Sequence, residues 1–131
     1  MVIPGLMAFI SYFASSIVFL VLFCVIYMRI TPYNEFKLIN EGNTAAAWSF
    51  SGALTGFVLP LASAIKHSVS LVDMCVWAAV ALIVQIISFI AVRLIFPSIV
   101  KDISSNQLSK GIFLGVISVA TGVLNAACLT Y

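Results

Sequence analysis

Four long apolar runs without a single Asp, Glu, Lys or Arg constrain this chain most strongly; they are Met1–Met28, Gly42–Ile65, Met74–Val92 and Gly111–Tyr131. The hydrocarbon core of a bilayer is about 30 Å thick and needs about 20 helical residues to cross it. Only 8% of the 131 residues are charged and 63% are hydrophobic, whereas about a quarter of the residues of a soluble domain are charged. We therefore predict an all-α membrane protein with four transmembrane helices.

The predicted helices extend a little beyond some of these runs; we expect them at Leu6–Met28, Thr44–Ile65, Leu71–Ile95 and Lys110–Thr130. The first run could be mistaken for a cleaved export signal. It lacks a basic segment before the apolar run, the run is too long, and no Ala-x-Ala cleavage site follows it. We therefore expect the first segment to span the lipid bilayer like the other three.

The distribution of Lys and Arg predicts the orientation. Basic residues concentrate in the loops that stay in the cytoplasm. Five lie at the first and third connections, whereas the opposite side carries only Lys66; the five are Arg29, Lys37, Arg93, Lys101 and Lys110. We therefore predict cytoplasmic first and third connections and, for a protein of a bacterial inner membrane, periplasmic termini. The net charge of +2 is too small to indicate a nucleic-acid partner.

The second half of the chain echoes the first. Two pairs recur: Arg29 and Pro32 as Arg93 and Pro97, and Thr55-Gly56 as Thr121-Gly122. Each half would be one helical hairpin, at about residues 6–65 and 71–130 of a single transmembrane domain. Because two spans return the chain to its starting side, the copies would insert the same way round, as a parallel repeat.

Each cytoplasmic connection could hold a short helix at the membrane interface. Thr31 followed by Pro32 resembles a helix start, and Gly42 resembles a stop. One side of this helix would face the membrane and the other the headgroups; the first group is Tyr33, Phe36 and Ile39 or Asn40, and the second is Glu35, Lys37 and Glu41. The second copy would use Pro97, Ile99, Val100 and Ile103. The alternative is an ordered loop without a helix.

Small residues recur at helical spacing in the second and fourth predicted spans. The set is Ala45, Ser49, Gly52, Gly56 and Ser63, with Gly111, Gly115, Ser118 and Gly122 in the second copy. Such stripes let helix backbones approach closely in lipid. We expect them to face another helix, either that of the other half or that of a second subunit. The competing hypothesis is a pore or groove lined by Ser49, Ser51, Thr55 and Ser63.

Three polar residues within the spans are candidates for a polar site. Gln85 and Asn125 should each form an interhelical hydrogen bond or line a wet cavity. Asp73 follows Ser70 by three residues, a spacing typical of a capping box at a helix start. The alternative is a site on an ion or proton path, with Asp73, Asn125 and Lys66 or His67 converging near one membrane surface.

Catalytic and metal sites are not expected. His67 is the sole histidine, so one chain cannot assemble a histidine cluster or a catalytic triad. Cys24, Cys75 and Cys128 are dispersed in apolar segments without the Cys-x-x-Cys spacing of a thiol oxidase. We expect packing roles for them, with a Cys75–Cys128 disulfide as the alternative, and we expect no cofactor.

Several segments together resemble a known family. They are "EFKLINEGNTAAAWSFSGALTGFVLPLASAI", "SVSLVDMCVWAAVALIVQ" and "TGVLNAACLTY". The chain is similar over nearly its whole length after the first span to the small bacterial inner-membrane proteins of the YjfL type, which consist of a duplicated two-helix unit. The resemblance implies an inner-membrane protein without an assigned reaction. It also implies a place beside membrane-stress proteins of the phage-shock type or a polyamine system.

The function expected from these features is a noncatalytic one. The small-residue stripes favour a homo-oligomer or a component that binds partners, with membrane-stress proteins as possible partners. The alternative is a small channel or transporter with Asp73, Gln85 and Asn125 on its polar path. A four-helix exporter normally carries an acid deep in its first span, and this chain has none there.

Overall fold

The computed structural model describes residues 2–129, which form six α-helices and, within that range, no strand. Four of them are long and apolar enough to cross a membrane, which confirms the predicted fold class. The long helices are α1 (Val2–Ile30), α3 (Thr44–His67), α4 (Leu71–Ile95) and α6 (Leu108–Cys128), and the short ones are α2 (Glu35–Asn40) and α5 (Ile99–Ser104). The order long, short, long therefore occurs twice.

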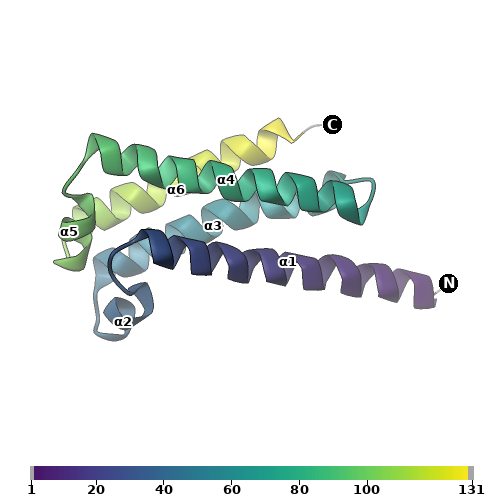
Figure 1. Cartoon of the computed structure of the whole chain (residues 1–131), viewed down its shortest axis with the longest axis horizontal. Helices are drawn as coiled ribbons and strands as arrows, with labels where there is room; N and C mark the ends of the chain where they lie inside the picture. Colours follow the sequence, from purple (N-terminus) through teal and green to yellow (C-terminus); the bar gives the residue numbers. More distant parts are fainter. Residues whose placement is uncertain (1, 130–131) are drawn as a thin grey trace.

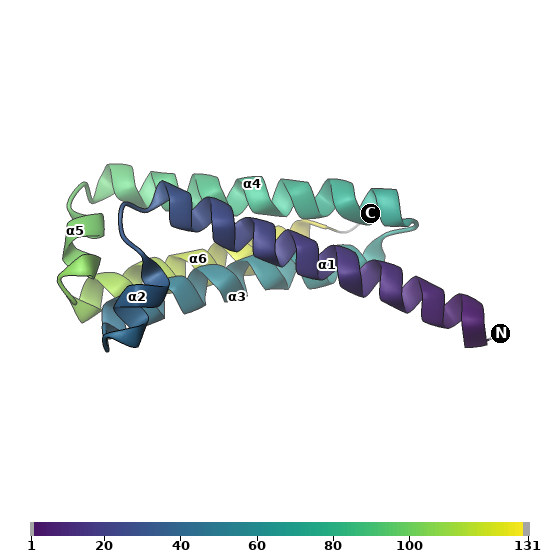
Figure 2. The ribbon, with the colours of Figure 1, turned by 60° about the horizontal axis from the view of Figure 1, so that its bottom comes forward.

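The long helices lie lengthwise beside one another, and both short helices lie at one end of the bundle (Figure 1). We call this end the short-helix end. The opposite end, which we call the terminal end, holds the start of α1, the end of α6 and the turn between α3 and α4. The first half of α1 diverges from the other long helices (Figure 2). Accordingly, only Ser16, Phe23 and Tyr27 of α1 are buried.

Most helix ends lie within a few residues of their predicted positions. α4 has the predicted bounds, and α3 begins at the predicted Thr44, where the Asn43 side chain accepts a hydrogen bond of 2.8 Å from the amide of Ala46. α1 extends further toward the N-terminus than predicted, and α6 begins two residues earlier. Thr130, the predicted end of the last span, lies outside the described residues.

The prediction for the start of the first short helix is wrong. α2 begins at Glu35, and its cap is Asn34, whose side chain accepts a hydrogen bond of 3.2 Å from the amide of Lys37. Thr31 does not cap α2, because the helix begins only at Glu35. The Thr31 hydroxyl instead lies within hydrogen-bond distance of the Glu35 carboxylate and of the carbonyl oxygen of Tyr27, the latter at 3.2 Å. Gly42 ends this connection with a left-handed φ of 88°, as expected for a helix stop.

The predicted sides of the short helices are wrong for three residues. Ile99 and Ile103 of α5 are fully buried in the bundle instead of lying at the interface, and so is Glu35 of α2, which was assigned to the headgroups. Phe36, by contrast, is exposed, although its ring packs edge-on against Phe50 with 5.5 Å between centroids. Both short helices therefore seal the short-helix end of the bundle.

The centre of the core near the short-helix end is aromatic. Phe23 stacks on Phe57 at 4.8 Å between centroids, and Tyr27 meets the edge of Phe89 at 5.2 Å. These four buried rings come from α1, α3 and α4. They attach the second half of α1 to the bundle, whereas its first half has few such contacts.

Candidate functional site

The small-residue stripe of α3 lies directly against α6 of the same chain. A methyl group added at Gly52 would overlap the backbone of Gly115, and one added at Gly122 would overlap the backbone of Gly56. The predicted packing residues are all buried except the half-buried Gly52; they are Ala45, Ser49, Gly52, Gly56, Gly111, Gly115, Ser118 and Gly122. The stripe is thus occupied within the chain and is not free for a second subunit.

Gln85 joins three helices at the middle of the bundle. Its side-chain amide donates hydrogen bonds to the carbonyl oxygens of Gly56, at 2.9 Å, and of Ser118, at 3.1 Å. The residue is only 3% exposed. Because the close approach of α3 and α6 places those two carbonyl groups side by side, Gln85 of α4 acts as an interhelical clasp.

Asp73 has a local role at the start of α4. The Ser70 hydroxyl accepts a hydrogen bond from the amide of Asp73, and the Asp73 carboxylate accepts one from the amide of Val69, each at 3.1 Å. This is the arrangement of a helix cap. Asp73 lies twelve residues before Gln85, or about 18 Å along α4 at 1.5 Å per residue, so the two do not share a site.

Asn125 and the cysteines form no site with the other predicted residues. The amide nitrogen of Asn125 is buried without a hydrogen-bond partner, about 10 Å along α6 from Ser118 at the helical rise per residue. Cys24, Cys75 and Cys128 are free thiols, so the alternative of a Cys75–Cys128 disulfide is wrong. The structure therefore does not bring Asp73, Gln85 and Asn125 together.

A different acid occupies the least ordinary environment in the described chain. Glu35 is fully buried, and one of its carboxylate oxygens accepts a hydrogen bond from the hydroxyl of Thr31. The other oxygen, Oε2, has no hydrogen-bond partner. Within residues 2–129 an ion pair joins Lys110 to Asp102, and no ion pair involves Glu35. A carboxyl group is thus buried with half of its hydrogen-bonding capacity unused.

Two tyrosines complete this site, which we call the Glu35 site and define as Tyr27, Thr31, Tyr33 and Glu35. The hydroxyl groups of Tyr27 and Tyr33 are both buried without a hydrogen-bond partner. Both tyrosines lie within electrostatic reach of the Glu35 carboxylate. These buried oxygen atoms therefore belong to residues that interact electrostatically at the junction of α1 and α2.

Burial controls the acidity of the Glu35 site. Loss of water contact raises the pKa of Glu35 to about 7, although the hydrogen bonds from Thr31 and from its own backbone amide act in the opposite direction. Burial, followed by the negative charge of Glu35, raises the pKa of Tyr33 well above its usual value. Ser49 and the positive charge of Arg93 oppose that rise. The carboxyl group of Glu35 can therefore gain or lose a proton near neutral pH.

Sequence reasoning missed Glu35, but the sequence contains a signal for it. Residues 35, 38 and 39 lie on one face of a helix, and in α2 this face combines Glu35 with the half-buried Leu38 and Ile39. The sequence interpretation instead grouped Glu35 with Lys37 and Glu41 as residues available to the headgroups. The structure turns the Glu35 side of α2 into the bundle.

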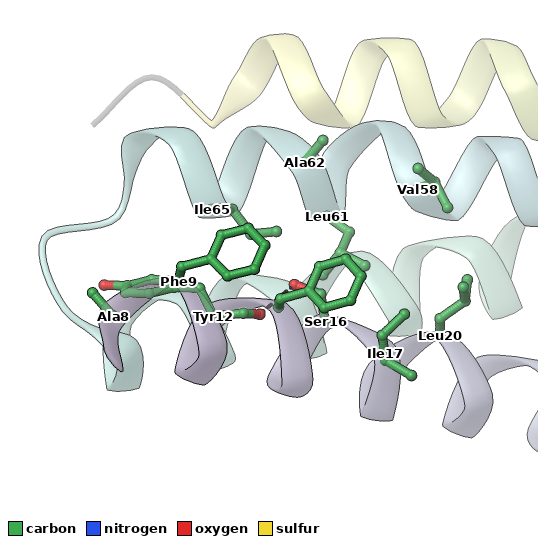
Figure 3. A pocket seen from close by; sticks show the side chains of 11 residues that line it. Ala8, Phe9, Tyr12, Ser16, Ile17, Leu20, Val58, Leu61, Ala62 and Ile65 are labelled. Carbon is green, nitrogen blue, oxygen red and sulfur yellow. Dashed lines mark hydrogen bonds between the residues drawn. The ribbon is translucent and has the colours of Figure 1, made fainter. Parts of the chain in front are cut away.

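The bundle also has apolar grooves between its long helices. A groove of about 440 Å³ lies between α4 and α6, and two others involve α3. One lies between the first half of α1 and α3, where Phe9 and Tyr12 point toward Leu61 and Ile65 (Figure 3). Its volume is about 440 Å³. The other, with a volume of about 390 Å³, we call the α3–α6 groove; it is lined by Trp48, Ser51, Gly52, Thr55, Gly115, Val116, Val119 and Ala120. Both grooves could take an apolar chain or helix.

Comparison with known proteins identifies the family. The model of the family described as Domain of Unknown Function (DUF350) matches residues 1–129. The chain belongs to the DUF350 family. It is 40% identical over 130 residues to the UPF0719 inner membrane protein YjfL of Escherichia coli strain K12, covering 99% of this chain and 98% of that protein. The YjfL protein of Escherichia coli O157:H7 matches equally well, and no solved structure matches.

The family assignment confirms the resemblance seen in the sequence. This DUF350 chain is an integral inner-membrane protein, and the names of its family and relatives indicate a location and no reaction. The four apolar helices agree with that location. The Glu35 site and the α3–α6 groove are thus two features of a DUF350 protein for which the comparisons provide no role.

Proposed function

We propose that this protein is a noncatalytic membrane component that self-associates through the α3–α6 groove. The observation that carries the proposal is the pair of exposed hydroxyl groups of Ser51 and Thr55, which line the groove and have no hydrogen-bond partner within residues 2–129. Hydrocarbon offers neither a donor nor an acceptor, so an unpaired hydroxyl in lipid costs free energy. Another helix in the groove would satisfy both groups.

A second copy of the chain is the occupant that the groove fits best. A two-fold interface uses the same surface of both subunits, so Ser51 and Thr55 of one copy could meet the same hydroxyls of the other. The small side chain of Ala120, which lines the groove, permits the close backbone approach that drives helix association in lipid. An acyl chain would fill the volume but would leave the hydroxyl groups unpaired.

The test fills the groove with larger side chains. Thr55→Leu and Ala120→Leu are expected to convert a dimer into a monomer, measured by native mass spectrometry in detergent and by single-molecule photobleaching in vesicles. Ala14→Leu is the matched control because Ala14 is exposed on α1 and lines neither groove. A monomeric wild type, or a groove variant that stays dimeric, would contradict the proposal.

The glycine contacts call for a different test from the one that the sequence favours. Bulky replacements at Gly52, Gly56, Gly115 or Gly122 would push α3 away from α6 within one chain. Their expected effect is therefore loss of folding, measured as a lower unfolding temperature. They do not distinguish a dimer from a monomer, whereas the groove variants do.

The orientation in the membrane belongs to the same proposal. Arg29, Lys37, Arg93, Lys101 and Lys110 all lie at or next to the short-helix end, and Lys66 lies at the terminal end. This supports a cytoplasmic short-helix end and periplasmic termini. Labelling of single cysteines with a membrane-impermeant maleimide in intact cells tests it. Label at the terminal end and none at the short-helix end is expected.

Association with membrane-stress proteins is a further part of the proposal, and it is supported by the resemblance to the YjfL type. Co-purification of phage-shock proteins with the wild type, and their loss with Thr55→Leu, would tie that association to the α3–α6 groove. The alternative function, a small channel or transporter, would need a continuous polar path. The clasp of Gln85 and the cap of Asp73 weigh against it; flux through vesicles that disappears in Asp73→Asn would support it.

We also propose that the two halves of the chain are copies of one unit. Glu35 and Ile99 each open a six-residue helix, and Gly42 and Asn106 each follow that helix with a positive φ. Both pairs are separated by 64 residues, as are Arg29 and Arg93. A common backbone plan at matching spacing supports a duplicated hairpin.

A further inference from the structure

The Glu35 site has no part in the proposed self-association, which uses the other side of α3. Its geometry raises a separate question, namely what neutralises a fully buried carboxylate. An isolated charge in an apolar environment is so costly that it must be paired or lose its charge by binding a proton. The candidates for a partner are the cations of the surrounding elements.

None of the nearby cations is placed to neutralise Glu35. Arg93 of α4 is exposed, and its guanidinium group lies 3.5 Å from the carbonyl oxygen of Ile30. Arg29 of α1 and Lys37 of α2 are also exposed, and Lys110 pairs with Asp102 at 3.5 Å. The other titratable groups near Glu35 are the thiol of Cys24 and the phenols of Tyr27 and Tyr33, and α3 contributes the hydroxyl of Ser49. These groups provide oxygens and a sulfur but no positive charge.

We propose that Glu35 is a binding site for one proton, exchanged with the aqueous phase at the short-helix end, and that this proton holds α2 against the bundle. The free oxygen Oε2 is the atom that takes the proton. The buried phenol oxygen of Tyr27 is an acceptor of the Glu35 site that has no other hydrogen bond. Burial raises the pKa of Glu35, which agrees with a carboxyl group that binds a proton.

The counterpart of Glu35 shows that the fold does not require a carboxyl group at this position. Ile99 opens α5 as Glu35 opens α2, and both residues are fully buried. An isoleucine seals the second junction without any polar partner. A buried acid in the equivalent place costs stability whenever it is ionised, so its presence in α2 indicates a role beyond packing.

The position of α2 makes it the element that responds to the proton. Glu35 is its first residue, and the two residues on either side of it, Asn34 and Phe36, are exposed. A small rotation of this six-residue helix would bring the carboxylate into water. Such a short helix has little stability of its own, so loss of the proton should loosen α2 while the long helices stay in place.

The first test observes the proton directly in the wild type. The chain has two glutamates, Glu35 and Glu41, so carbon-13 labelling of glutamate carboxyl groups separates their infrared bands from those of the aspartates. We expect a protonated carboxyl band that disappears as the pH rises from 5 to 9, with a midpoint near neutral pH. Glu35→Gln should remove this band, and Glu41→Gln, the matched control on an exposed residue, should keep it.

Two outcomes of this test would overturn the proton site. One is a labelled band that does not change between pH 5 and 9. The other is a band that shifts when sodium chloride replaces choline chloride at constant pH, because a metal cation would then compete for the carboxylate. If Glu35→Gln fails to fold, the labelled wild type and Glu41→Gln still provide both readings.

The second test measures the movement of α2 by amide hydrogen exchange in nanodiscs. After correction for intrinsic exchange, the α2 amides of the wild type should exchange at least tenfold faster at pH 8.5 than at pH 5.5. The α5 amides serve as the internal reference and should not change. Glu35→Gln should remove the pH dependence. Equal protection of α2 at both pH values would overturn its release by deprotonation.

Discussion

The junctions α1–α2 and α4–α5 have the same backbone plan and bury different chemistry. Each joins a long helix to a six-residue helix whose first residue is fully buried. Each ends in a residue with positive φ, 88° at Gly42 and 62° at Asn106. The first buries the carboxyl group of Glu35, whereas the second buries Ile99. The fold therefore needs only a side chain that fills space at this position. The proton-binding group is a feature of the first junction alone.

The capping of the two short helices, α2 and α5, also differs. The side chain of Asn34 caps α2 with a hydrogen bond of 3.2 Å, whereas Ser98 makes no side-chain hydrogen bond to the start of α5. The hydroxyl group of Ser98 instead donates to the Asp102 carboxylate at 3.0 Å, and Asp102 also pairs with Lys110. The acid of the second junction is thus paired near the surface, whereas the acid of the first is buried and unpaired.

The largest effect is expected when the second junction is made to resemble the first. Ile99→Glu would bury a carboxyl group without the hydroxyl groups that surround Glu35, and it would lose the burial of an isoleucine. The expected loss of stability is about 4 kcal/mol or more, measured by unfolding in detergent with tryptophan fluorescence. Ile99→Val is the control, with an expected loss of about 1 kcal/mol. If Ile99→Glu is tolerated as well as Ile99→Val, the two junctions are equivalent hosts for an acid.

The second-largest effect is expected in the pH dependence of stability, which we attribute to Glu35 of the first junction. The pKa of Glu35 is about 7 in the folded protein and about 4.3 in an unfolded chain. The folded state therefore binds the proton more tightly, so this contribution is fully present below about pH 4 and is lost as the pH rises to about 7. The loss amounts to about 4 kcal/mol.

Glu35→Leu should abolish that part of the pH dependence. Unfolding free energies at pH 5 and pH 8 are expected to differ less in Glu35→Leu than in the wild type. Glu41→Leu changes an exposed residue and should keep the wild-type difference. Equal pH dependence in Glu35→Leu and the wild type would show that the first junction does not bind the proton.

The sequence was sufficient for features with local causes. Apolar run length predicts the four spans, and the spacing of Ser70 and Asp73 predicts a cap whose hydrogen bonds the structure contains. The sequence alone could not predict that Gln85 pairs with Gly56 and Ser118. Those two carbonyl groups belong to different helices, and their positions depend on how closely the glycines let the helices approach.

The burial of Glu35 was missed for a geometric reason. Glu35, Leu38 and Ile39 share one face of a helix whether it starts at Pro32 or at Glu35. Which face of α2 turns inward depends on how α2 packs against α3 and on where α1 ends. The local sequence of α2 does not determine these contacts.

A smaller effect is expected from Thr31→Val, which removes the one side-chain donor of Glu35. Hydrogen bonds to charged groups contribute about 1.5 kcal/mol or more, so the variant should lose about that amount at pH 8, where Glu35 is ionised, and less at pH 5. The protonated carboxyl band of Thr31→Val should disappear at a higher midpoint pH than that of the wild type. Thr44→Val is the matched control, because Thr44 donates to the Asn106 side chain at 3.1 Å and has no contact with Glu35. An equal loss at both pH values in Thr31→Val would contradict the role of its hydroxyl group.

The smallest effect on stability is expected at the position where both junctions have the same backbone conformation. Gly42 and Asn106 both adopt positive φ, a conformation that glycine and asparagine tolerate better than other residues. A side chain added at Gly42 would meet no atom within 4 Å, so only backbone strain opposes it. Gly42→Asn should therefore change the unfolding free energy by about 0.5 kcal/mol or less, whereas Gly42→Val should lose about 1 to 2 kcal/mol. If Gly42→Asn is as unstable as Gly42→Val, the backbone plan of the second junction does not transfer to the first.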